Sequence, residues 1–296
     1  MGTVTPVDEY AGTLTFPDNG DDLEAPDVEA VIQILANRGK HLLDATAGLA
    51  VWGWKLRVAP GGAASGNTGV FVPMIEALNL LSGTSRYAER LSGETQLTTA
   101  DHFGGGTLAN STWYYVYAKI SASALALEIS ADAPEAGLVW KSGAGGTHRY
   151  IGCFRTDSFG VPIPMQMVRG TYRYDLSEVT ASVLQALNIT SAVPTSFSNV
   201  DCSALIPPHA TLGHFRIEMV NADATNWGRT ELRKDGATTD VLQVDCPPAG
   251  ASHSAYHREC FDLQVSASTR VIEYRRDNGA SRADCDISIQ VLGFSE

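Results

Sequence analysis

The residues best suited to metal chemistry lie in one short segment, CPPAGASHSAYHREC. It carries Cys246, His253, His257 and Cys260, which are residue types that zinc favours. Histidines four apart share a helix face, but the Pro, Gly and Ser content predicts a loop that runs into a strand. In a strand the two histidines would lie about 13 Å apart, too far for one ion. We therefore predict a surface loop with incidental histidines, no bound metal and no cofactor.

Other chemical signals along the chain are sparse. The segment GAGGTHR lacks the Lys-Ser/Thr ending of a phosphate-binding loop, and HFGGGTLANS is not accompanied by a G-x-S-x-G nucleophile motif. Trp227, in the polar segment DATNWGRT, could stack on a sugar ring or could be a core residue. The sequence predicts no catalytic residues and a protein that is not an enzyme, with Trp227 as the candidate ligand-binding residue.

The segment NSTWYYVYAKIS is rich in aromatic residues and carries one charge. In a strand, Trp113, Tyr115 and Tyr117 would share one face, and Tyr114 and Val116 would share the other. Neither face suits water. Either layers of the same chain cover both faces, or a neighbouring copy covers one of them, because interfaces between subunits are rich in aromatic residues and poor in charge. We list Trp113, Tyr115 and Tyr117 as candidate interface residues.

The composition limits the class of protein. The chain has 296 residues, enough for two domains, and a formal net charge of -12 with no basic run. This charge disfavours nucleic-acid binding, which depends on clustered Lys and Arg. No signal peptide and no membrane-spanning apolar run is expected. The five cysteines are odd in number and form no CxxC pair, which predicts buried free thiols.

A short N-terminal helix is predicted to begin at Pro26, where the missing N–H of proline costs nothing. Its apolar residues repeat at heptad spacing over about two and a half repeats. Such a stripe packs either on its own domain or on copies of itself, and its position near the N-terminus favours self-association. The stripe residues are Val28, Val31, Ile32, Leu35 and Leu42.

The rest of the chain is predicted to be mainly β. Short apolar runs separated by Gly, Ser, Asn and Pro define a β-rich middle domain at 49–175, after an N-terminal segment and helix at 1–48. Residues 176–296 are expected to form an antiparallel, jelly-roll-like β-sandwich. The runs Phe261 to Val265 and Ile287 to Val291 alternate strictly, as strands with one wet face do.

The opening, LTFPDNGDDLEAPDVEAVIQILANRGKHL, carries a "dgD...a..vn...e.lanr...L" pattern in an extended segment and helix. In this it is similar to the openings of tailed-bacteriophage and prophage appendage proteins, where such a unit precedes β-rich modules. The unit from STWYYVYAKIS to RYIGCFRTDSFGVPIPMQMVRGTYRYD is similar to a module with the pattern R.IG.F.TD..G...P....G..Y.Y. The last unit, from NVDCSALIPPHA to ISIQVLGF, resembles their terminal sandwich, with "dlS..vP..A" and "i.V.Gf" phrases. Cys202 interrupts the first of these two phrases, and Arg38 and Gly39 weaken the helical stripe.

The resemblance implies a structural virion protein, a homotrimeric tail fibre or related fibre or decoration protein, assembled in the host cytoplasm and released with the particle. Its expected partners are its own copies, other virion proteins at the N-terminal segment and a host-surface glycan, without nucleic acid or membrane insertion. The resemblance carries over no catalytic residue. A carbohydrate-binding or carbohydrate-cleaving adhesin is the alternative.

Overall fold

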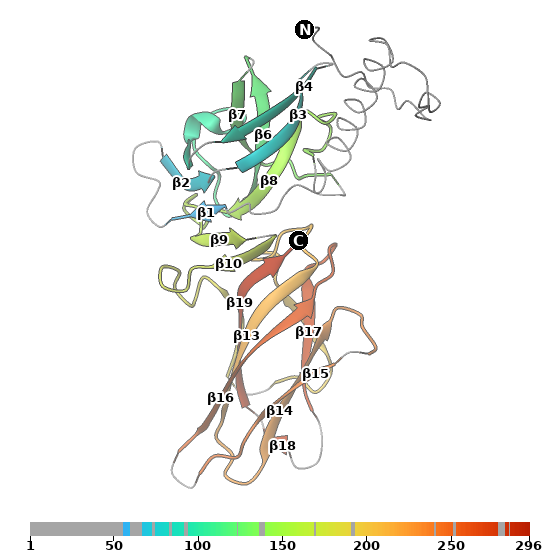
Figure 1. Cartoon of the computed structure of the whole chain (residues 1–296). Coiled ribbons are helices and arrows are strands. Elements are labelled where there is room, and N and C mark those ends of the chain that lie inside the picture. Colours follow the sequence, from blue (N-terminus) through green and yellow to red (C-terminus); the bar gives the residue numbers. More distant parts are fainter. Residues whose placement is uncertain are drawn as a thin grey trace, which may run out of the picture.

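The structure is a computed structural model of the whole chain, shown in Figure 1. It describes residues 56–59, 67–72, 75–82, 85–91, 94–122, 124–135, 140–168, 170–190, 193–239, 241–250, 253–277, 282–283 and 285–296. The predicted helix and its stripe, with Val28, Val31, Ile32, Leu35 and Leu42, lie outside the described residues. We call residues 56–168 the N-terminal lobe and residues 170–296 the C-terminal lobe.

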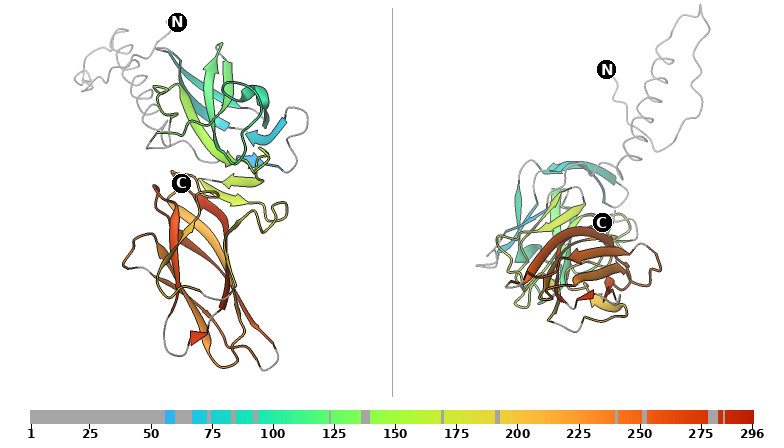
Figure 2. Two further views of the ribbon diagram at one scale, coloured as in Figure 1. Left: turned by 180° about the vertical axis from the view of Figure 1, so that it is seen from behind. Right: turned by 90° about the horizontal axis from the view of Figure 1, so that it is seen from below.

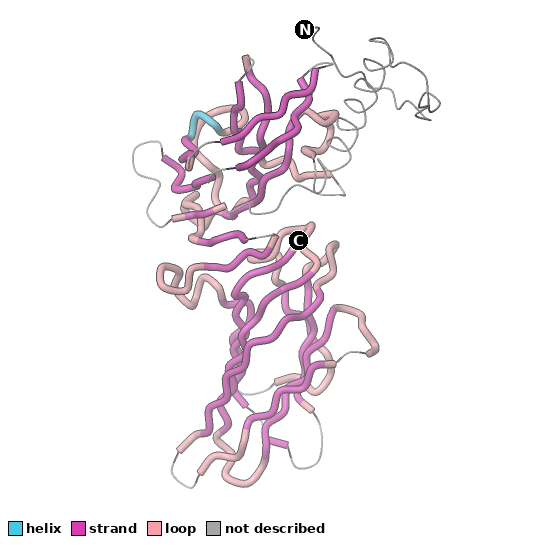
Figure 3. Tube along the Cα trace, in the orientation of Figure 1, coloured by secondary structure: helices cyan, strands magenta, loops and turns pink. Residues whose placement is uncertain are grey.

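The described chain is mainly β, as predicted, and its one helical element is the single 3-10 turn η2 (Thr99–Asp101) (Figure 3). A nine-stranded sheet extends through both lobes, and every strand pair in it is antiparallel. Its order is β16 (Ala255–Gln264), β13 (Leu212–Asn221), β19 (Cys285–Ser295), β10 (Thr171–Tyr174), β9 (Met165–Val168), β1 (Arg57–Val58), β2 (Asn67–Val72) and β5 (Thr95–Thr98), with β11 (Gln185–Ile189) also paired to β19.

A five-stranded sheet forms the other layer of the C-terminal lobe (Figure 1). The alternation predicted at the end of the sequence is present in β19, where Ile287, Ile289 and Val291 are buried and the residues between them are half-buried. Phe261 of β16 stacks on Phe215 of β13 and packs against the same core. The second sheet consists of β12 (Ser198–Asp201), β17 (Val271–Arg276), β14 (Trp227–Lys234) and β15 (Leu242–Cys246), with β18 (Arg282–Ala283) parallel to β14.

In the N-terminal lobe, the aromatic segment forms β6 (Trp113–Ser121), the middle strand between β7 (Ala124–Ser130) and β8 (His148–Arg155). The hairpin of β3 (Ile75–Ser82) and β4 (Ser85–Leu91) contacts this sheet. Tyr114 stacks on Phe154, while Tyr115 lies against His209 of the C-terminal lobe. The same chain therefore covers both faces of β6.

This coverage corrects part of the predicted interface between copies. The side chains of Tyr115 and Tyr117 are buried, and the Tyr117 hydroxyl donates a hydrogen bond of 2.7 Å to the Asp132 carbonyl. Trp113 is half-buried, lies edge-on to Phe294, and donates from Nε1 to the Ser203 carbonyl at 3.3 Å. Tyr115 and Tyr117 cannot contact a second copy, because their own chain already removes them from water.

Strand pairing continues across the predicted domain boundary at residues 175 and 176. β10 lies before the boundary, yet it pairs with β19, the last strand of the C-terminal lobe. It also forms a hairpin with β9 of the N-terminal lobe, through a turn at Gly170. The lobes are distinct in Figure 2 but share this sheet, so independent folding of residues 176–296 stays a prediction.

Candidate functional site

The residues predicted as the best metal candidates do not converge in the structure. Cys246, in β15, is buried, with Sγ 3.7 Å from the Ala255 carbonyl oxygen. Cys260 is exposed, unlike the buried thiol that was predicted. His257 and Cys260 both lie in β16 but three residues apart, so their side chains point to opposite faces of the strand. His253 lies just before β16 and is exposed.

Trp227 begins β14 in the C-terminal lobe, and 49% of its surface is exposed. The alternative that it is a core residue therefore does not hold. It pairs by register with Arg282 of β18, and the described pocket residues discussed below belong to the other lobe. Its role in ligand binding stays a prediction.

A different group of chemically competent residues lies where the two lobes meet. Cys153 comes from β8, His209 from the turn between β12 and β13, and Glu296 from the position that follows β19. The pairing of β10 with β19 positions Glu296, whose backbone N–H donates to the Gly170 carbonyl at 3.1 Å. Among the described residues, no other group of three His, Cys, Asp or Glu side chains brings its ligand atoms this close together, all within 4.8 Å.

The three side chains point at one another. Nε2 of His209 lies 2.7 Å from Oε1 of Glu296. Sγ of Cys153 lies 3.7 Å from the same oxygen and 3.9 Å from the same nitrogen. Cys153 is fully buried, whereas the side chains of His209 and Glu296 keep 12% and 9% of their surface exposed. One edge of the cluster thus reaches solvent.

Tyrosines enclose this cluster. The Tyr150 hydroxyl donates to Oε1 of Glu296 at 2.5 Å and lies 3.3 Å from the Tyr172 hydroxyl. The backbone N–H of Cys153 donates to the Tyr172 hydroxyl at 3.2 Å. Burial raises the pKa of the Tyr150 and Tyr172 hydroxyls and of the Cys153 thiol well above their ordinary values, so all three are neutral near pH 7.

The arrangement does not suit a cysteine nucleophile. In a Cys-His-acid triad one ring nitrogen meets the thiol and the other meets the acid. Here Nε2 of His209 faces both Cys153 and Glu296, and Nδ1 is buried with no hydrogen-bond partner. A buried thiol with a raised pKa is also a poor source of thiolate. Three ligand atoms that face one point suit ion binding better than acyl transfer.

No spacing in the sequence marks this cluster. Cys153 and His209 are 56 residues apart, and His209 and Glu296 are 87 apart. Only the sheet register brings them together, and a single sequence does not specify pairing between strands so distant.

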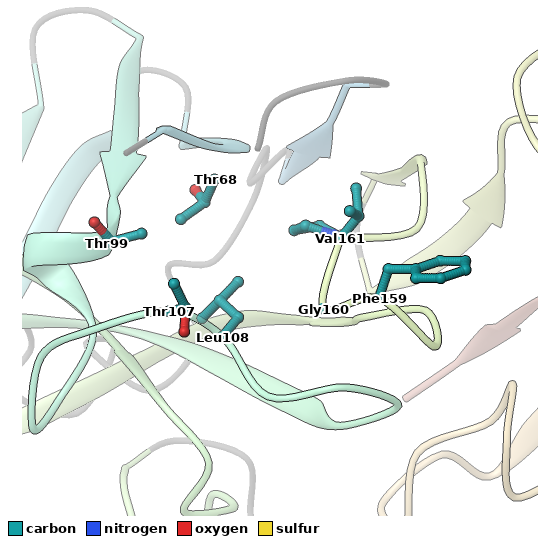
Figure 4. Close-up of a pocket in the computed structure, with 8 residues that line it drawn as sticks. Thr68, Thr99, Thr107, Leu108, Phe159, Gly160 and Val161 are labelled. Carbon is teal, nitrogen blue, oxygen red and sulfur yellow. The ribbon is translucent and has the colours of Figure 1, made fainter. Parts of the chain in front are cut away.

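A pocket of about 230 Å³ lies in the N-terminal lobe (Figure 4), and none of the three cluster residues lines it. Thr99 lies across it from Gly160 and Phe159, and Thr107 adds a second hydroxyl. The hydroxyl of the buried Thr68 already donates to the Leu97 carbonyl at 2.7 Å. Phe159 is 83% exposed. The lining contains hydroxyl and apolar groups and no acid or base, which suits binding rather than bond cleavage. The lining residues are Thr68, Thr99, Thr107, Leu108, Phe159, Gly160, Val161 and Pro162.

Neither a protein-family model nor a curated protein matches the chain. Among solved structures, it is similar to an exo-β-1,3-galactanase from Phanerochaete chrysosporium with galactose, at 12% identity and a TM-score of 0.23, covering 75% of this chain and 54% of that chain. A Cry1Da tryptic core variant from Bacillus thuringiensis has 7% identity and a TM-score of 0.24, with 83% and 52% covered. The chain thus spans about half the length of these structures.

Among the described residues, no helix has the length and apolar character needed to cross a membrane.

Proposed function

We propose that this protein is a non-enzymatic structural component of a tailed-phage virion, a tail fibre or related fibre or decoration protein. In this proposal the N-terminal segment attaches to the particle and joins copies into a trimer. The C-terminal lobe is a jelly-roll-like sandwich that faces outward, toward a host-surface glycan. The protein is made in the host cytoplasm and leaves with the particle.

The proposal is supported by the structural roles of Thr156, Gly160 and Gly293, which belong to the patterns shared with phage appendage proteins. Gly160 adopts a φ of +79°, and a Cβ there would lie 2.7 Å from the Leu108 carbonyl oxygen. A Cβ on Gly293 would lie 2.0 Å from the Tyr172 carbonyl oxygen. Thr156 donates to the Ala109 carbonyl at 2.7 Å. These positions define turns and close strand contacts, so the resemblance concerns architecture and not a shared active site.

The second candidate function, a carbohydrate-binding adhesin, is favoured by the pocket beside Phe159. Phe159, whose ring is exposed, and Thr99 line opposite sides of this pocket (Figure 4). They offer a stacking surface and a hydroxyl for hydrogen bonding, the two contacts that a sugar ring uses. The pocket is smaller than the roughly 300–1,000 Å³ of typical small-molecule sites, which suits one sugar unit at the end of a glycan. Both candidate functions are compatible, since a fibre can carry a binding site.

Incubation with oligosaccharides from the host surface separates binding from cleavage. The purified full chain is expected to bind an intact glycan and to leave its length unchanged in mass spectra. Shortened products that accumulate with time, and that disappear when the protein is heat-inactivated, would show an enzyme instead and would contradict the non-enzymatic part of the proposal.

A further inference from the structure

We propose that Cys153, His209 and Glu296 form a zinc site that joins the two lobes of the chain. The sequence predicts no metal, and the four residues with zinc-like spacing, described above, lie elsewhere. The site is independent of the proposed function, because it would stabilise the junction between the lobes in a fibre, an adhesin or an enzyme.

The present separations are close to those of ligands around one zinc ion. Tetrahedral zinc, with bonds of about 2.3 Å to sulfur and about 2.0–2.1 Å to nitrogen and oxygen, places sulfur about 3.6 Å from each other ligand and nitrogen about 3.4 Å from oxygen. Sγ of Cys153 is already 3.9 Å from Nε2 of His209 and 3.7 Å from Oε1 of Glu296. Only the 2.7 Å separation of Nε2 and Oε1 must widen, by less than 1 Å.

The charges of the three ligands also balance the charge of a zinc ion. Zinc displaces the thiol proton of Cys153, and that proton leaves to solvent. The thiolate and the carboxylate of Glu296 then balance the two positive charges of the ion, and the imidazole of His209 stays neutral. The bound site carries no net charge, which limits the cost of placing an ion among buried tyrosines.

The surrounding groups give the site its support. Tyr150 donates to the carboxylate of Glu296, as groups around a metal site commonly do for the ligands. The partly exposed edge of His209 and Glu296 gives an ion a path inward and leaves the fourth position to a water molecule. A metal-free hydrogen-bond network would explain the contact between His209 and Glu296, but it would not require the weakly hydrogen-bonding sulfur of Cys153 to point at the same place.

The ligands come from both lobes, so an ion bound to all three would join one lobe to the other. Cys153 belongs to the three-stranded sheet of the N-terminal lobe, while His209 and Glu296 belong to the C-terminal lobe. An ion that binds the folded chain and not the unfolded chain raises its stability by mass action. Zinc bound to these three residues and a water molecule would therefore stabilise the folded chain.

Elemental analysis of the full chain, purified without chelator, tests the proposal. We expect about one zinc per chain. Removal by a chelator should lower the melting temperature by about 5–10 °C relative to protein in zinc at about a hundred times its dissociation constant, and added zinc should restore it. Cobalt in place of zinc should give a thiolate-to-cobalt charge-transfer band. A chain that holds no metal in saturating zinc, with an unchanged melting temperature, would overturn the proposal.

Matched variants locate the ion. Cys153→Ser and Glu296→Gln should each lose the stoichiometric zinc and the melting shift, and Cys153→Ser should also lose the cobalt band. Two cysteine variants outside the cluster serve as controls: Cys202→Ser removes another buried thiol, and Cys260→Ser removes the exposed thiol. Both variants should keep the stoichiometric zinc, the melting shift and the cobalt band. Glu296→Gln is isosteric and partly exposed, so it serves if Cys153→Ser does not fold. Zinc that persists in Cys153→Ser and Glu296→Gln, or is lost only in Cys260→Ser, would be adventitious and would contradict the site.

Discussion

The ring of Tyr172 stacks on the ring of Phe294, with centroids 4.4 Å apart and planes 16° apart. The two residues are direct partners in the pairing of β10 with β19, and both are almost fully buried. Trp113 of the N-terminal lobe lies edge-on to the same Phe294 ring, with centroids 5.6 Å apart. One aromatic cluster thus connects the last strand of the chain to both the hairpin between the lobes and the aromatic strand β6.

Phe294→Ala should destabilise the protein strongly. The substitution removes a buried ring from contact with two aromatic partners and leaves a cavity, which typically costs about 3–5 kcal/mol of unfolding free energy. Denaturant unfolding of the full chain measures the effect. Phe159→Ala, which truncates an 83% exposed ring, is the control and should change the unfolding free energy by less than about 0.5 kcal/mol. Equal effects of the two substitutions would show that the Phe294 ring is not buried.

Residues 176–296 should fold alone but less stably than a fragment that keeps β9 and β10. Without β10, the C-terminal end of β19 loses the strand that pairs with it on one side, and the Phe294 ring loses its contact with the Tyr172 ring. A fragment of residues 165–296 should therefore melt at a higher temperature than 176–296, with both showing a β-type circular dichroism spectrum. A disordered 176–296 fragment would mean that the two lobes form a single folding unit.

Acid should weaken an ionic cluster around Glu128. Burial alone would raise the pKa of Glu128, but hydrogen bonds and charge from Lys119 and Lys141 outweigh burial and lower it. Nζ of Lys141 lies 2.9 Å from Oε1 of the nearly buried Glu128 carboxylate. Because the pKa is lower in the folded chain, the stabilisation is complete above the unfolded pKa of about 4.3 and is lost as pH falls through the folded pKa.

Glu128→Gln should therefore lower the unfolding free energy at pH 7 by about 1.5–3 kcal/mol and reduce its slope with pH below about 4.3. Denaturant titrations at several pH values measure both. Glu94→Gln, in the exposed pair with Arg57, should cost no more than about 1 kcal/mol. If the slope of the unfolding free energy with pH below about 4.3 were unchanged in Glu128→Gln, Glu128 would not be the group whose protonation weakens the fold in acid.

Phe159→Ala should abolish glycan binding without loss of stability, since the ring is exposed and packs on little of its own chain. Calorimetric titration with host-surface oligosaccharides tests this. The control is Tyr256→Ala, a 70% exposed aromatic of β16 in the C-terminal lobe, which should leave the affinity unchanged. Loss of binding in Trp227→Ala, with Phe159→Ala unaffected, would place the sugar site at the residue predicted from sequence.

Leu35→Asp should convert a trimer into monomers without unfolding the C-terminal lobe, because a charge in the apolar stripe disfavours self-association. Sedimentation velocity of the full chain measures the mass. Gln33→Asp, which lies off the stripe, should stay trimeric. An intact chain that sediments as a monomer at every concentration would contradict the trimer.

Local sequence patterns predicted that the chain is mainly β. The order of the strands and the residues that meet between the lobes depend on pairing between strands far apart in the sequence. The strand in STWYYVYAKIS and the alternation of Ile287, Ile289 and Val291 are both present, because each depends on neighbours along the chain. The segment MVRGTYRYD is instead divided by the turn at Gly170 into β9 and β10, which pair with each other. The cluster of Cys153, His209 and Glu296 could not be predicted, since it exists only through the register of β10 with β19 and of β6 with β8.

Antibody-gold labelling of particles purified from the source of the gene tests the virion assignment most directly. We expect gold to mark an appendage of intact tailed particles, at the same position on each particle. Peptides of this chain should also remain in the particle fraction after washing. Unlabelled particles, with the protein found entirely in the particle-free fraction, would show that it is not a virion component.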